Sequence, residues 1–138
     1  MVKGEEKVLS AEQVLSSKDI KSEKVFVPEW GGSVYVKALT AAERDQYESS
    51  IVEFGSDGKP RKYRLDKVRS LLAAMTICDE NGNRLFEDKD VAALGKKSSA
   101  ALDRVFKAAQ SLSAISKKDV EDLADGLKND QSADSPSG

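Results

Sequence analysis

The chain offers few residues that could carry covalent or acid–base chemistry. Its 138 residues contain no His, so the side chain that most often serves as a general base is missing, and with it a common zinc ligand. The single Cys, Cys78, follows the apolar run 71–77, where a buried structural thiol is expected. We therefore expect a protein that is not an enzyme, with no catalytic residues and no cofactor.

The segment 79–83 has the composition of a calcium-binding loop. An EF-hand loop requires Gly at its sixth position and Glu at its twelfth. Counted from Asp79, Gly82 falls at the fourth position and Asp90 occupies the twelfth. Because Asn-Gly favours a tight turn, we expect an ordinary turn here and no metal site.

Trp30, the only Trp, is the side chain best suited to bind a partner protein. It lies in the turn 28–33, and Trp provides a large contact area at a low entropy cost. Alternatively, its indole folds back over the neighbouring strands. Pro fixes φ and the two Gly residues allow positive φ, so the chain can reverse here. The candidate protein-interaction residues of this turn are Trp30, Pro28, Gly31 and Gly32.

A second candidate surface is basic. Segment 58–69 contains six basic residues and one acidic residue. Its simplest interpretation is a solvated loop and helix face; an acidic protein partner comes next, and nucleic acid last. The whole chain carries a formal net charge of −2, and no array of aromatic residues accompanies the run. The candidate protein-interaction residues here are Arg61, Lys62 and Arg64.

These candidates require elements that position them. The β-branched and aromatic runs 25–27 and 34–36 predict a hairpin over 24–37. Thr40 and Glu43 have the spacing of a capping box, which predicts that a helix begins at residue 41. The expected helices are 41–54, 63–78, 88–94, 99–114 and 117–128, with a loop at 55–60. The predicted fold is mainly α, of α+β type: an N-terminal β-hairpin followed by a bundle of four to five short helices.

Two helices are expected to form the centre of one domain that spans 10–128. The helix 63–78 is apolar over most of its circumference, so it should be the most buried element. The helix 99–114 has a single apolar stripe and should pack onto it. That stripe consists of Leu102, Val105, Phe106, Ala109 and Leu112. Residues 1–9 are expected to be flexible and the polar residues 129–138 to be disordered.

The composition, 39% hydrophobic and 33% charged, is that of a globular domain. No apolar run approaches the roughly 18–20 residues of a membrane span, and the N-terminus lacks the apolar core of a secretory signal. We therefore expect a cytosolic protein that binds neither membrane nor nucleic acid.

The order and spacing of these segments resemble the tail assembly chaperones of long-tailed bacteriophages with non-contractile tails. The similarity covers roughly residues 10–125, and its most specific element is Pro-Glu-Trp-Gly-Gly at 28–32. The segments that carry it are 17–20, 28–32, 39–45, 73–86, 102–106 and 112–113.

The resemblance implies a function in the host bacterial cytoplasm. Members bind the tape measure protein, keep it soluble, recruit tail tube protein subunits and are absent from the mature virion. Many also exist as a longer isoform made by ribosomal frameshifting, so the implied partners include that isoform and further copies of the chain, as a homo-oligomer. The alternatives are a structural head–tail connector or minor tail protein and, more remotely, a small nucleic-acid-binding regulator.

Overall fold

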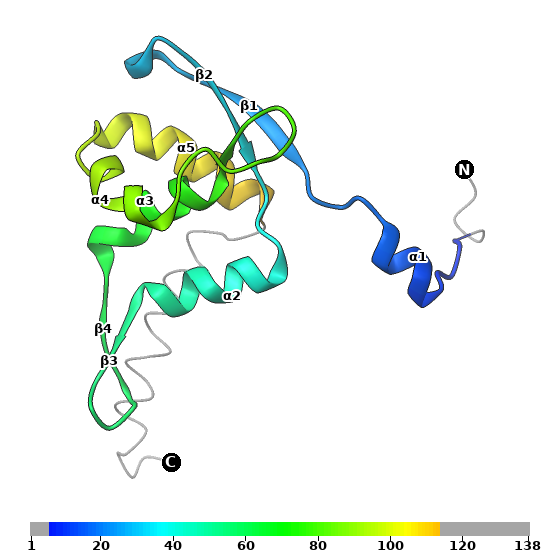
Figure 1. The fold of residues 1–138 in the computed structure, drawn as a ribbon, viewed down its shortest axis with the longest axis horizontal. Helices are drawn as coiled ribbons and strands as arrows, with labels where there is room; N and C mark the ends of the chain where they lie inside the picture. Colours follow the sequence, from blue (N-terminus) through cyan, green and yellow to red (C-terminus); the bar gives the residue numbers. More distant parts are fainter. Residues whose placement is uncertain (1–5, 114–138) are drawn as a thin grey trace.

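A three-stranded antiparallel sheet forms one layer of the protein (Figure 1). The computed structural model describes residues 6–113; the expected helix 117–128 and the tail 129–138 lie outside them. The strands are β1 (Ser22–Val27), β2 (Gly32–Lys37) and β5 (Ile77–Cys78), in the order β1-β2-β5. β1 and β2 pair along their full length, as the sequence predicts, and β2 also pairs with β5 at Val36 and Ile77.

A second, two-stranded sheet lies where the sequence predicts the end of a helix and a loop. Helix α2 (Ala41–Ser50) is followed directly by β3 (Val52–Phe54) and β4 (Pro60–Tyr63). The helix ends early because Ile51 and Val52 are β-branched, and such side chains lose rotamer freedom in a helix but pack well in a strand. The expected loop is the tip of this hairpin, where Gly58 adopts a φ of 80°.

The remaining elements are helical. They are α1 (Ala11–Ser16), α3 (Leu65–Thr76), α4 (Val91–Leu94) and α5 (Ser99–Leu112), with two short 3₁₀ helices, η2 (Pro28–Trp30) and η3 (Asp88–Asp90). The N-cap of η3 is Glu87, whose backbone N–H donates to Asp90 Oδ2.

The prediction of a mainly α fold built as a helix bundle is therefore wrong. Among residues 6–113 the protein is α+β, with five α-helices and five strands in two sheets. Apart from the predicted hairpin, the strands are only two to four residues long. Such short strands follow or precede helices without a break, so an apolar β-branched run reads as the end of a helix.

The core lies between the sheet and two helices. Val27 and Val36 are fully buried on the face of the β1–β2 hairpin that α5 covers, and α3 packs against α5. Helix α3 is the most extensively buried element described, as expected, although its first residue, Leu65, is 71% exposed. The stripe of α5 also packs inward, except that Phe106 is only partly buried.

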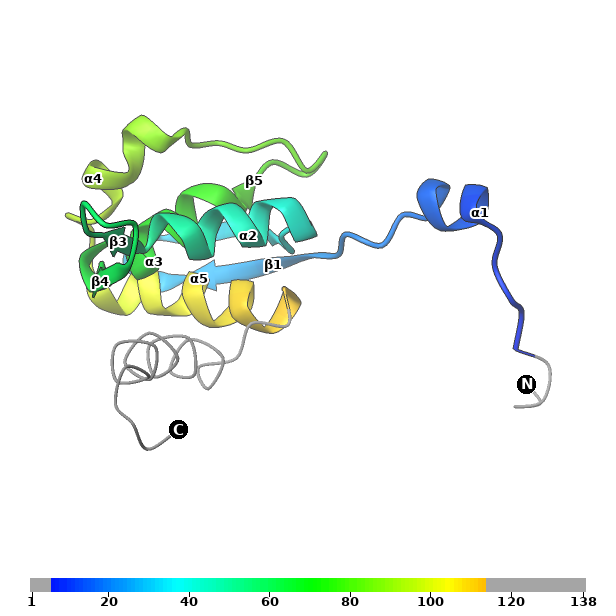
Figure 2. The same cartoon turned by 90° about the horizontal axis from the view of Figure 1, so that it is seen from below.

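Helix α1 extends away from this body on its own linker (Figures 1 and 2). A capping box closes its N-terminus, because Ser10 Oγ accepts a hydrogen bond from Gln13 N and Gln13 Oε1 accepts one from Ser10 N. None of its residues is buried. The same reciprocal bonds link Thr40 and Glu43 at the start of α2, which confirms the capping box predicted there.

Candidate protein-interaction surfaces

The Trp30 turn is a single 3₁₀ turn between two paired strands. Pro28 occupies its first position, where a missing N–H costs nothing, and Gly31 ends it with a left-handed φ of 71°. Gly31 N donates to Pro28 O at 3.0 Å. This geometry brings Trp30 against the edge of the core, where its side chain is half-buried.

An ion pair fixes the turn to the body. Arg104, on α5, donates from Nε to Glu29 Oε1 at 2.9 Å and from Nη2 to Glu29 Oε2 at 3.1 Å. This two-point contact holds the pKa of Glu29 below its usual value, chiefly through the side-chain hydrogen bond from Arg104. The turn that carries Trp30 is therefore held in a defined position.

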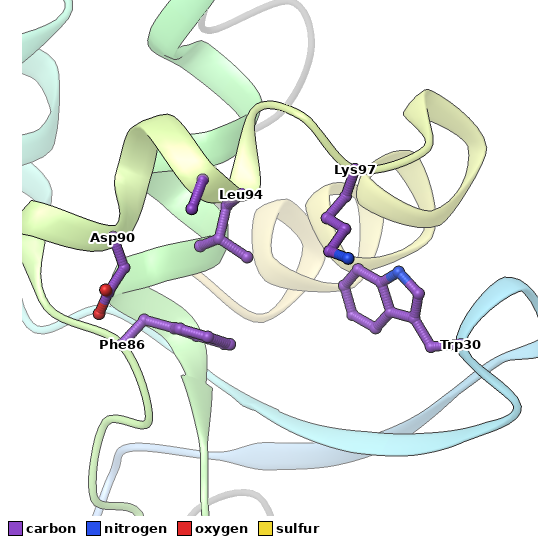
Figure 3. A pocket seen from close by; sticks show the side chains of 6 residues that line it. Trp30, Phe86, Asp90, Leu94 and Lys97 are labelled. Atoms are coloured by element: carbon purple, nitrogen blue, oxygen red, sulfur yellow. The ribbon is translucent and has the colours of Figure 1, made fainter.

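Trp30 forms one wall of a pocket of about 500 Å³ (Figure 3). The opposite wall comes from Phe86 and from α4, so the pocket opens between the hairpin tip and the segment that carries η3 and α4. Its lining residues are Trp30, Phe86, Asp90, Ala93, Leu94 and Lys97. The volume falls within the range of roughly 300–1,000 Å³ typical of binding pockets, and most of the lining is apolar.

Two opposite charges lie at the two ends of this pocket. Figure 3 shows Asp90 beside Phe86 and Lys97 beside Trp30. Asp90 Oδ2 accepts a hydrogen bond from Glu87 N at 2.8 Å, and Lys97 forms no ion pair with another of the residues 6–113. The pocket therefore combines an apolar floor with one acidic and one basic end, which suits an amphipathic peptide segment.

Of the basic candidates, Arg61 and Lys62 lie on β4, and Arg64 follows that strand as the N-cap of α3. Arg61 Nη2 is 3.0 Å from Asp57 Oδ2, and Arg64 Nε is 3.9 Å from Glu53 Oε2. Both ion pairs are solvent-exposed and weak. Lys62 is exposed between them on β4, and Phe54 on the facing strand is 53% exposed. The hairpin thus presents a basic surface beside an apolar side chain.

The structure does not bring the two candidate sets together. The β1–β2 turn and the β3–β4 hairpin extend from opposite sides of the body in Figure 1. Sequence reasoning selected Trp30 but missed its neighbours in the pocket, Phe86, Ala93, Leu94 and Lys97. They follow Trp30 by more than fifty residues, and nothing in their local sequence links them to the turn.

The groups with potential chemistry have structural roles. Cys78 is buried in β5, and burial raises the pKa of its thiol, which disfavours the reactive thiolate. Asp79 Oδ1 accepts hydrogen bonds from the backbone N–H groups of Asn81 and Asn83, as in an ordinary turn. Residues 6–113 contain no cluster of His, Cys, Asp and Glu that could hold a metal ion. Over the same residues, no helix is both long and apolar enough to cross a membrane.

The described residues thus form an α+β fold with an apolar pocket beside Trp30 and a basic hairpin. The chain belongs to the phage tail assembly chaperone family, because the model of that family matches residues 11–125. Among solved structures, the chain is similar to the tail assembly chaperone of bacteriophage HK97, with 16% identity and a TM-score of 0.47 over 70% of this chain and 94% of that one. No functionally curated protein matches the chain.

Proposed function

We propose that this protein binds the tape measure protein in the cytoplasm of the host bacterium, keeps it soluble, and recruits tail tube subunits to it. The protein then leaves before the virion is complete. The observation that supports this proposal is the match to the tail assembly chaperone family over residues 11–125. The partners named in the proposal are those of the family members that the sequence resembles.

The surfaces of the protein are compatible with this role. A chaperone of a long helical protein needs reversible contacts in many copies rather than covalent chemistry. We assign the basic β3–β4 hairpin, with Arg61, Lys62 and Arg64, to an acidic segment of a protein partner. Phe54, half-exposed beside these charges, adds an apolar contact. Because a long partner must be covered along its length, we include self-association into a homo-oligomer in the proposal.

Co-expression with the tape measure protein of the same phage tests the main claim. We expect the soluble fraction of the tape measure protein to rise when this chain is present and the two to co-purify. Reversal of the charge of the basic hairpin by Arg61→Glu and Lys62→Glu should reduce co-purification. A matched control is Lys89→Glu, an exposed basic residue of η3 outside both surfaces. If the tape measure protein is equally insoluble with and without the chain, the proposal is wrong.

The alternative role, a structural head–tail connector or minor tail protein, predicts a different location. A chaperone should be absent from purified virions, whereas a connector should remain in them in the fixed number of copies of a ring. Quantitative mass spectrometry of purified particles decides between the two roles. Stoichiometric amounts of this chain in the particle would favour the connector.

The proposal includes a longer isoform made by ribosomal frameshifting. Such an isoform requires a slippery heptamer near the end of the reading frame, at which two adjacent codons can pair again one base back. The Lys-containing segments 96–97, 117–118 and 127–129 are compatible with A-rich runs. The DNA sequence decides this point: absence of a heptamer in the last third of the gene would remove the isoform from the proposal.

A further inference from the structure

The N-terminal arm, residues 6–20, exposes apolar side chains that nothing in the described part of the chain covers. The exposed fractions are 93% for Val8, 52% for Leu9, 54% for Val14, 86% for Leu15 and 45% for Ile20. Helix α1, at the centre of the arm, is capped but has only six residues. Isolated helices shorter than about 12 residues are marginal in water, so packing against another surface would stabilise α1.

The Trp30 pocket has the chemistry to receive this helix. Val14 and Leu15 are adjacent apolar residues at the end of α1, and the walls of the pocket are the side chains of Trp30 and Phe86. The small side chain of Ala93 also lines the pocket. Burial of the apolar pair in an apolar pocket removes both surfaces from water.

The charges that flank the apolar pair match the charges at the ends of the pocket. Glu12 precedes the pair and Lys18 follows it, while Lys97 and Asp90 lie at the two ends of the pocket. Asp90 and Lys97 are seven positions apart in nearly helical backbone, which places them about 10 Å apart. Glu12 and Lys18 are six positions apart and span between about 9 and 13 Å, so both pairs of opposite charges can form at once.

The arm reaches the pocket of another copy more readily than its own. It joins the body at Ser22, at the start of β1, whereas Trp30 follows the other end of that strand. The six residues of β1 span about 20 Å, and the five linker residues 17–21 span about 17 Å when fully extended. Docking within one molecule would force the linker to turn back and run straight along β1. In both views the arm instead points away from the body (Figures 1 and 2).

We propose that the arm of one copy binds in the Trp30 pocket of a second copy, with Val14 and Leu15 between Trp30 and Phe86. Glu12 pairs with Lys97, and Lys18 pairs with Asp90. This proposal deepens the self-association that is part of the proposed function, and it names the segment and the pocket that make the contact. Because each copy carries one arm and one pocket, the contact is head-to-tail and can add further copies.

Two matched pairs of variants of the full chain test the contact. Leu15→Asp places a charge on the arm at a site that is 86% exposed, and Val8→Asp is its control on the same arm. Ala93→Glu places a charge in the pocket, and Ala92→Glu is its control on the same exposed stretch of α4. We expect sedimentation velocity to show concentration-dependent association for the parent and both controls, and monomers for Leu15→Asp and Ala93→Glu.

Mixing the two defective variants distinguishes exchange between copies from docking within one. Leu15→Asp retains an intact pocket and Ala93→Glu retains an intact arm, so together they should form a complex that stops at two copies. If the mixture remains monomeric while the parent associates, the arm does not bind in the pocket of another copy. If Leu15→Asp associates like the parent, the arm is not the contact.

Fluorescence of the single Trp reports occupancy of the pocket directly. A synthetic peptide with residues 6–21 contains no Trp or Tyr, so its titration into the Leu15→Asp protein should shift the emission of Trp30 to shorter wavelength. A peptide with Leu15→Asp should bind about tenfold or more weakly. An unchanged emission with both peptides overturns the proposal. Loss of peptide binding together with normal solubilisation of the tape measure protein would overturn the arm contact and leave the proposed function intact.

Charge reversal tests the orientation of the arm. Glu12→Lys and Lys97→Glu should each weaken association, and the double variant should recover most of the loss because the pair is restored with exchanged signs. If the loss of association in the double variant equals the sum of the losses in the two single variants, Glu12 and Lys97 are not partners.

Discussion

Gly31 and Gly32 are neighbours with different backbone requirements. Only Gly31 adopts a left-handed φ, of 71°, and no atom lies within 4 Å of a Cβ added at either position. We expect Gly31→Ala to lower the free energy of unfolding by about 1–2 kcal/mol, because an L residue is strained at positive φ. Gly32→Ala should change it by less than about 0.5 kcal/mol. Urea denaturation measures both, and equal effects would contradict the turn geometry.

Tyr47 makes the stability of the protein sensitive to alkaline pH. Its hydroxyl is buried and donates to Val68 O at 2.8 Å, and burial, followed by the charges of Tyr63 and Glu48, raises its pKa. The unfolded chain releases this proton near pH 10 and the native protein retains it. The contribution of Tyr47 to the free energy of unfolding is therefore fully present below pH 10. Above pH 10 it falls by up to about 1.4 kcal/mol per pH unit.

Tyr47→Phe should lower the free energy of unfolding by about 1 kcal/mol at neutral pH, through the lost hydrogen bond, and should reduce the alkaline slope. Burial also raises the pKa values of Tyr63 and Cys78. Both groups are present in the parent and in the variant, so their effect on the slope cancels when the two proteins are compared. Urea titrations from pH 7 to 11 measure the slopes. An identical slope in the variant would show that Tyr47 is not the titrating group.

Helix α5 packs onto α3 through residues that differ in burial. Leu102 is 4% exposed, whereas the ring of Phe106 is only partly covered and lies 5.8 Å from the guanidinium carbon of Arg69. We expect Leu102→Ala to cost about 2–5 kcal/mol. Phe106→Ala should cost less than the roughly 3–5 kcal/mol of a fully buried Phe. Thermal and urea denaturation compare the stability losses of the two variants. A larger loss for Phe106→Ala would contradict the lower burial of Phe106.

The elements could be predicted where local chemistry determines them. The hairpin β1–β2 and the capping box of α2 depend on side chains within a few residues, and the structure agrees with both predictions. The strands β3, β4 and β5 were missed because they are short and adjoin helices. Strand β5 is stabilised by pairing with β2, some forty residues earlier, and no local pattern of Ile77 and Cys78 encodes that pairing.

At the scale of the whole molecule, the arm and the body should respond differently to protease. Lys18 is exposed in the linker after α1, whereas Lys67 is part of the helix α3. We expect trypsin to cleave after Lys18 in the native monomer, at concentrations too low for association, at a rate that urea below the unfolding midpoint does not change. Cleavage after Lys67 should follow global unfolding. Mass spectrometry of timed digests separates the two sites, and equal rates would show that the arm is not an independent unit.

The candidate surfaces illustrate what a sequence can and cannot predict. Trp30 was recognisable from its type and its turn, and Arg61 and Lys62 from their charge. The pocket was not, because it forms only when α4 packs beside the hairpin tip, and Phe86, Ala93 and Leu94 have no unusual local features. The composition of a pocket depends on which distant segments meet, and that is decided by the tertiary fold.

The Glu29–Arg104 ion pair joins residues that are 75 positions apart in the chain. The ribosome therefore completes the β1–β2 hairpin long before it makes the helix that covers it. At about 5–20 residues per second the delay is roughly 4–15 s. During that interval Val27 and Val36, which are fully buried in the finished protein, face water on the nascent chain. We expect the rate of translation between these two points, and thus the choice of synonymous codons there, to influence the yield of folded protein.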